Sequence, residues 1–172
     1  MRPSYLNFFG FTREPFGSDI EIPNILETEE VRAVSDRFDY AVRLGAIGLV
    51  TGEVGSGKST ALRFALSRLH PSEYRSIWIT ASSGSILEFY RQLAGELEVE
   101  TNTFSRAVLL RIIRGQVLEL ATKAKLKPVL VIDEAALLMI AVYAELHTLT
   151  QFEAYSKPYL PIILAGQNNL VD

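Results

Sequence analysis

The sequence of 172 residues contains no cysteine and only two histidines, His70 and His147. Without cysteine, the chain can form no disulfide, no thiolate metal site and no cysteine nucleophile. Two histidines are also too few for a metal site built from imidazoles. The absence of cysteine is compatible with a reducing compartment, and we expect a cytoplasmic location.

Long apolar runs and an excess of one charge are also missing. The 17 Lys and Arg residues against 20 Asp and Glu give a net charge of -3, which excludes an overall basic surface of the kind that binds nucleic acid. The apolar run 135–144 stops at Glu145, too short to cross a membrane. Polar residues and prolines interrupt residues 1–17 before they could form a signal-peptide core. We therefore expect no membrane contact.

The apolar and charged residues that are present, 48% and 22%, suffice for one domain with a sizeable core. Short apolar runs predict buried strands at residues 46–51, 76–80, 129–132 and 161–165. Helical periodicity predicts helices at residues 27–44, 58–69, 85–97, 105–125 and 143–152. Residues 1–24 show no clear period, and we expect an extended entry segment across the core. The alternation predicts an α/β fold, a parallel sheet with helices on both faces.

The segment GEVGSGKS, residues 52–59, lies between the first predicted strand and the following helix. Glycine, four free residues and then Gly-Lys-Ser is the pattern of a phosphate-binding loop. Gly55 and Gly57 can adopt positive φ and let backbone N–H groups approach phosphates. Lys58 is then expected to reach the β and γ phosphates, and the Ser59 hydroxyl to bind Mg²⁺. The alternative is a chance glycine turn with an exposed lysine.

Two carboxylates follow the strand VLVI, at Asp133 and Glu134. A buried parallel strand ends at the carboxyl edge of the sheet, where open α/β folds bind ligands, so Asp133 should face the same crevice as Lys58. There Asp133 can hold Mg²⁺ and Glu134 can polarise a water for attack on the γ phosphate. Alternatively, both residues merely open the next helix, whose positive end favours acidic side chains.

Weaker candidates remain. Gln167 follows the fourth strand and either senses the γ phosphate or simply starts a turn. The aromatic-rich entry segment either stacks near an adenine or packs in the core; its candidate residues are Phe9, Phe11, Pro15 and Phe16. Three arginines of one predicted helix, Arg106, Arg111 and Arg114, form either a solvated face or a contact for nucleic-acid phosphates.

The segments YLNFFGFTREPFG, TGEVGSGKST, VLVIDEA and LPIILAGQNNL resemble the AAA+ ATPases of the ExeA type, first linked to general secretion. Similar domains serve as helper ATPases in DNA transposition. The resemblance implies that the loop comprises Gly52, Glu53, Val54, Gly55, Ser56, Gly57, Lys58, Ser59 and Thr60, with Thr60 near the α phosphate. It also implies that Asp133 and Glu134 form the magnesium and water-activating pair, and that Gln167 is the sensor.

The chain departs from this family in three places. Asn168 and Asn169 stand where the family usually has Pro and Glu, Gln151 stands where it often has Asn, and the residues 139–141 are apolar where the family is commonly polar. Such ATPases also continue into a fifth core strand and a helical lid. We therefore expect residues 1–172 to be a single P-loop NTPase core of AAA+ type that lacks this lid.

The sequence thus predicts an ATPase that binds ATP and Mg²⁺, of the general-secretion type, and that assembles with like subunits as part of its full-length protein. A DNA-transposition helper and a nucleotide-dependent switch with little turnover are alternatives, so DNA or a secretion-envelope protein is the expected further partner. A small-molecule kinase is disfavoured because Glu134 directly follows Asp133. A GTPase is disfavoured because no Asn-Lys-x-Asp or Thr-Lys-x-Asp segment is present.

Overall fold

Four parallel strands form a sheet in the order β1-β4-β3-β2 in the computed structural model, which describes residues 4–15, 17, 20–152 and 157–171. The strands are β1 (Ile47–Thr51), β2 (Tyr74–Thr80), β3 (Lys127–Asp133) and β4 (Ile162–Gly166). All four lie where short apolar runs predict them. The parallel arrangement follows because a helix-containing connection joins each strand to the next.

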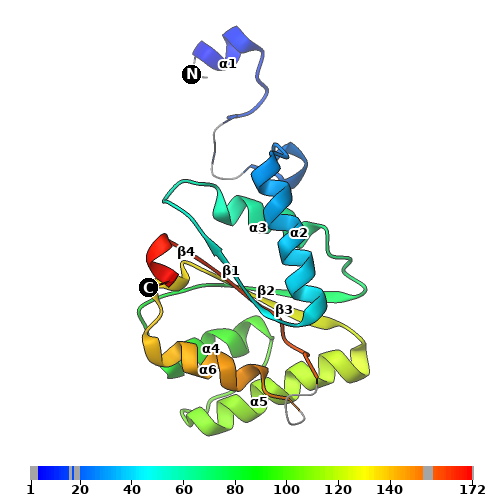
Figure 1. The fold of residues 1–172 in the computed structure, drawn as a ribbon, viewed down its shortest axis with the longest axis vertical. Coiled ribbons are helices and arrows are strands. Elements are labelled where there is room, and N and C mark those ends of the chain that lie inside the picture. Colours follow the sequence, from blue (N-terminus) through cyan, green and yellow to red (C-terminus); the bar gives the residue numbers. More distant parts are fainter. Residues whose placement is uncertain (1–3, 16, 18–19, 153–156, 172) are drawn as a thin grey trace.

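Helices cover both faces of this sheet, as the sequence predicts (Figure 1). One face carries α2 (Glu29–Leu44) and α3 (Lys58–Ser67). The other carries α4 (Ile86–Glu96), α5 (Arg106–Glu119) and α6 (Ile140–Thr150). The expected α/β fold class is therefore confirmed.

Each face of the sheet has its own apolar core. The core beneath α2 and α3 contains Phe38, Leu62, Val131 and Ile163. The larger core beneath α4, α5 and α6 contains Tyr90, Leu109, Ile113, Leu130, Ile132, Leu146 and Leu149. Full burial of such an aliphatic side chain stabilises the fold by about 1.5–3 kcal/mol. The two cores fix β3 and β4, whose residues are buried almost throughout, between the helical layers.

The helix ends mostly follow local sequence signals. The Ser85 hydroxyl accepts a hydrogen bond from the Glu88 N–H, and the Glu88 carboxylate accepts one from the Ser85 N–H, so the predicted capping box opens α4. The helix predicted for 105–125 is present, but it changes type before its end. After α5 the chain continues as a π-helical turn, η2 (Leu120–Ala124), and Lys125 adopts a left-handed conformation that stops it.

The expectation of an extended entry segment across the core is wrong for residues 4–9. These form a short helix, α1 (Ser4–Phe9), which stands apart from the layers over the sheet, and η1 (Ile22–Asn24) is a 3₁₀ turn (Figure 1). Phe9 packs against Phe8 and Phe11, with ring centroids 4.9 and 5.8 Å apart. This local aromatic cluster accompanies the helix, which is too short for a periodic pattern to reveal.

The expectation that the first strand is buried on both faces is also wrong. β1 lies at one edge of the described sheet, where its one neighbour is β4, and Ile47 and Leu49 are 48% and 45% exposed. A purely apolar segment resembles a central strand, but strand order depends on long-range pairing that local composition does not encode. None of the helices in the described part of the chain has the length and hydropathy that a membrane span requires.

Candidate nucleotide site

The glycine-rich loop connects β1 to α3 and leaves its backbone open. Gly55 and Gly57 have φ of 78° and 85°, in the left-handed region that glycine adopts without strain. A Cβ atom at either position would meet no heavy atom within 4 Å. Gly57 is the N-cap of α3, and no side chain caps this helix. The first N–H groups of α3 therefore remain available to an anion.

Lys58 opens α3 and bends back over the loop. Its Nζ atom donates to the carbonyl oxygens of Gly52 and Glu53, at 2.9 and 2.8 Å. The next two residues, Ser59 and Thr60, lie half-buried in the first turn of the helix. The ammonium group, two hydroxyls and the helix N-terminus thus gather at one end of α3.

Asp133 is the last residue of β3 and pairs in register with Thr80 of β2. It is buried, and its Oδ1 atom accepts a hydrogen bond from the N–H of Glu134 at 2.9 Å. Glu134 itself is exposed and has φ of 53°, an uncommon conformation for a residue with a Cβ. In the described part of the chain, its carboxylate forms no hydrogen bond or ion pair.

Strand register brings the separate motifs to one edge. β4 lies between β1 and β3, with Thr51 opposite Gly166 and Leu164 opposite Ile132. The loop after β1, Gln167 after β4 and the carboxylates after β3 therefore follow neighbouring parallel strands at the same end of the sheet. A Cβ atom on Gly166 would lie 3.2 Å from the N atom of Ala136, so β4 closely approaches the segment after Glu134. Gln167 is exposed.

A hydrogen bond that sequence reasoning missed joins the loop to the end of β4. Asn168, in the 3₁₀ turn η5 (Asn168–Val171), donates through Nδ2 to Oε1 of Glu53 at 2.7 Å. The two residues are far apart in sequence, and nothing in either local pattern signals their contact.

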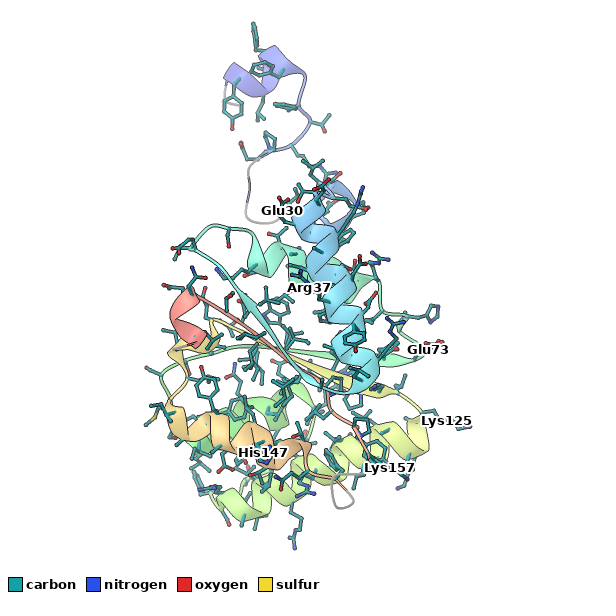
Figure 2. All side chains as sticks on the ribbon, viewed as in Figure 1. Glu30, Arg37, Glu73, Lys125, His147 and Lys157 are labelled. Atoms are coloured by element: carbon teal, nitrogen blue, oxygen red, sulfur yellow. The ribbon has the colours of Figure 1, made fainter. Side chains whose placement is uncertain are left out.

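A cavity of about 560 Å³ adjoins the loop on the side of α2. Its lining is largely apolar and comes from the segment before α2, α2 itself, the end of β1, the loop and the first turn of α3: Ile20, Ile25, Leu26, Thr28, Glu30, Val31, Val34, Val50, Thr51, Gly52, Ser56, Gly57, Lys58, Thr60 and Ala61. Glu30 lies near the start of α2 and Arg37 farther along it (Figure 2). Of the entry-segment candidates, Phe9, Phe11 and Pro15 do not line this cavity, and Phe16 lies outside the described residues.

The arginines considered for nucleic-acid contact are mostly engaged within the fold. Arg106 forms an ion pair with Glu145, which is buried. Arg114 donates to the carbonyl oxygen of Gln151 and lies over the Phe152 ring, 5.1 Å from its centroid. Arg111 is exposed on α5.

Neither histidine belongs to this edge of the sheet. The Nδ1 atom of His70 accepts from the Ser72 N–H in the turn after α3, and His147 is exposed on α6 (Figure 2). Within the described residues, no group of three or more His, Asp or Glu side chains could hold a metal ion by itself.

A parallel sheet in which one strand leads through a glycine-rich loop into a helix, with carboxylates at the end of the next strand but one, defines the P-loop class of nucleotide-binding folds. Within that class, the model of the AAA domain family matches residues 42–172, and the chain belongs to this family. The sequence is also 29% identical over 168 residues to general secretion pathway protein A of Aeromonas hydrophila. That alignment covers 96% of this chain but 30% of the relative.

Two solved structures share the fold. Cdc6p from Pyrobaculum aerophilum superposes with a TM-score of 0.71 at 18% identity, over 90% of this chain and 42% of its own. A Walker-type ATPase of Pyrococcus abyssi gives 0.59 at 20% identity, over 89% of this chain and 49% of its own. This chain thus spans less than half of each of these proteins. The predicted relationship to AAA+ ATPases of the ExeA type is confirmed.

Proposed function

We propose that this chain binds ATP with Mg²⁺ at the carboxyl edge of the sheet and hydrolyses it. The observation that carries the proposal is the convergence at this edge of an open glycine-rich loop, Lys58, and the carboxylates of Asp133 and Glu134. Each group matches a different part of a magnesium nucleotide, and the parallel register places all of them together.

The loop residues 52–60 would bind the phosphates. Their N–H groups and the positive end of α3 attract anions, and Gly55 and Gly57 leave room for close approach. The Lys58 ammonium already satisfies two carbonyl oxygens of the loop, so it is held over the position where the β and γ phosphates would lie. Thr60, one of the residues that line the cavity, would contact the α phosphate.

The donors available to Mg²⁺ are the Ser59 hydroxyl and the Asp133 carboxylate, both hard oxygen ligands of the kind this ion prefers. When bound, the ion would neutralise charge on the phosphates. Glu134 would polarise the attacking water, because its carboxylate is exposed and has no partner in the described part of the chain. Gln167, after the strand between the two motifs, would orient that water and sense the γ phosphate.

The cavity beside the loop fits the base of the nucleotide. Its apolar walls, which include Ile25 and Val31, suit the faces of a purine, and its polar groups include Thr28 at the N-cap of α2. Ile25 and Val31 both precede the loop in the sequence.

We further propose a role for this domain in a general-secretion protein that assembles with like subunits and works in the cytoplasm. The support is the 29% identity to general secretion pathway protein A, a relative of which the chain spans 30%. A contact with DNA is the competing proposal and is separated from it by the test below.

The test is release of inorganic phosphate from ATP by the purified chain, with and without Mg²⁺ and with Lys58→Met as the control for nucleotide binding. Release that requires both Mg²⁺ and Lys58 would support the proposal, whereas failure to bind ATP would contradict it. Transfer of phosphate to an added acceptor would identify a kinase, and ATP-dependent association without release would identify a switch. Stimulation by duplex DNA would favour a DNA-linked helper over the secretion role.

A further inference from the structure

Glu134 occupies a strained turn that other parts of the structure must stabilise. Its left-handed conformation, φ 53°, is unfavourable for a residue with a Cβ. The chain then turns through η3 (Ala135–Leu137), in which the Leu137 N–H donates to the Glu134 carbonyl and the Leu138 N–H to the Ala135 carbonyl. These backbone bonds alone do not connect the turn to the rest of the fold.

Ala135 and Leu138 pack into the larger core, and one side-chain hydrogen bond adds to this packing. The Tyr143 hydroxyl, on the first part of α6, donates to the carbonyl oxygen of Ala135 at 2.5 Å. Ala135 is the residue directly after Glu134 and is fully buried. Tyr143 is half-buried, and burial raises the pKa of its hydroxyl, so the donor stays protonated at neutral pH.

The helix that carries Tyr143 is itself firmly held. Val142, Leu146 and Leu149 are buried in the core between α6 and the sheet. Glu145 forms an ion pair with Arg106 of α5 and accepts a hydrogen bond from the Tyr90 hydroxyl of α4. Tyr143 therefore acts from a fixed support, whereas the turn that it contacts is exposed at Glu134 and Leu137.

From this arrangement we infer that Tyr143 is a positioning residue for Glu134. By fixing the Ala135 carbonyl, its hydroxyl holds the turn after β3 and keeps the Glu134 carboxylate aimed at the edge of the sheet where the nucleotide would bind. The inference rests on the proposed function. Tyr143 does not line the cavity beside the loop, so its hydroxyl affects the use of bound nucleotide and not the binding.

Replacement of Tyr143 by Phe removes the hydroxyl and keeps the ring. We expect kcat for ATP hydrolysis to fall by about five- to tenfold, because small displacements of a catalytic group are costly, while KM and nucleotide affinity stay the same. The matched control is Tyr90→Phe, which removes another buried tyrosine hydroxyl beneath α6 but leaves the Arg106 ion pair and the apolar contacts of α6 in place. Equal losses of kcat in the two variants would overturn the inference.

A double variant separates positioning from general loosening. Added to Glu134→Gln, the Tyr143→Phe change should cause no further loss of the residual turnover, since the group that it positions is already gone. A further loss equal to that in the parent chain would contradict this. If Glu134→Gln itself turns over like the parent, the assignment of Glu134 in the proposed function fails instead.

A measurement without turnover keeps the inference testable in a chain that hydrolyses slowly. Amide hydrogen exchange at Leu137 and Leu138, whose N–H groups close the turn, should become severalfold faster in Tyr143→Phe and stay unchanged in Tyr90→Phe. Unchanged exchange at both amides in Tyr143→Phe would overturn the inference.

Discussion

Lys58 and Lys127 lie at opposite ends of the parallel strands, and the ammonium group of each donates hydrogen bonds to two backbone carbonyl oxygens. Lys58, at the carboxyl edge, donates to the carbonyls of Gly52 and Glu53, and Lys127, at the amino edge, donates to those of Val42 and Arg43. The second pair of carbonyls ends α2, so Lys127 caps a helix, and burial lowers its pKa. The carbonyls below Lys58 belong to an open loop at the start of a helix. The contact of Lys127 therefore stabilises a helix end, whereas the contact of Lys58 holds its ammonium group beside an open loop that can bind a ligand.

Two glutamates repeat the contrast. The Glu145 carboxylate is buried, and both of its oxygens have partners, Arg106 and the Tyr90 hydroxyl. Glu134 is exposed, and in the described part of the chain its carboxylate has none. Residue type alone thus does not separate stability from chemistry in this fold. What separates them is whether the protein itself satisfies the polar atoms.

The lysine comparison is tested by paired substitutions. Lys58→Met should weaken ATP binding by about a hundredfold, the loss expected for charge-assisted hydrogen bonds to phosphate. Lys127→Met should leave ATP affinity unchanged and lower the free energy of unfolding by about 1 kcal/mol. Titration calorimetry and denaturant unfolding measure the two effects. Similar ATP affinities for the two variants would contradict the claim that only the lysine at the carboxyl edge binds nucleotide.

The Glu145 network is expected to contribute stability only. Glu145→Leu leaves the buried Tyr90 hydroxyl without its acceptor and should lower the free energy of unfolding by about 2 kcal/mol. Adding Tyr90→Phe should recover part of this loss, because the unsatisfied hydroxyl is then removed. Urea unfolding of the single and double variants gives these values. Turnover per folded molecule should stay at the parent level, and a specific fall in kcat would show that the network takes part in chemistry.

Substitution of Gln167 tests whether a third side chain at the carboxyl edge takes part in ATP turnover. Gln167→Ala should slow ATP turnover by about tenfold, if the amide orients the attacking water, and leave nucleotide affinity nearly unchanged. Asn168→Ala is the control at the neighbouring position, because it removes a different side chain of the same turn, one that forms a hydrogen bond with Glu53 of the loop. Steady-state turnover that is unaltered in Gln167→Ala would assign this residue to the turn alone.

The smallest expected effect is on the pH dependence of stability, and it arises from Tyr90. Burial, together with the hydrogen bond to Glu145, raises the pKa of Tyr90 above its ordinary value near 10. The folded state therefore favours the protonated phenol, and this stabilisation is complete below about pH 10 and is lost as the pH rises further. Tyr90→Phe should unfold with a weaker dependence on alkaline pH than the parent. Identical thermal unfolding profiles up to pH 11 would contradict this.

Most of the fold follows from the sequence because its signals are local. The four strands are short apolar runs, and the capping box at Ser85 and the glycine-rich loop have fixed spacings. Once β3 is read as a buried parallel strand, the position of Asp133 at the carboxyl edge follows from chain direction alone. The exposure of β1 does not follow, because it depends on which strands pair.

The parts of the site that sequence reasoning missed depend on tertiary contacts. The cavity walls at Ile25 and Val31 lie beside the loop only after α2 packs against α3, and the Asn168–Glu53 bond joins distant segments. The sequence alone does not decide between a solvated face and a nucleic-acid contact for Arg106, because its ion-pair partner, Glu145, lies on a different helix. The left-handed turn at Glu134 likewise has no glycine to signal it.

The most direct test of the account is ATP turnover and ATP affinity measured together in the parent chain, Glu134→Gln and Glu145→Gln. We predict that Glu134→Gln keeps its affinity for ATP with Mg²⁺ and loses turnover by about a hundredfold or more, as expected for removal of a general base. Glu145→Gln should turn over like the parent. Full turnover by Glu134→Gln, or equal losses in both variants, would contradict the assignment of hydrolysis to the carboxyl edge of the sheet.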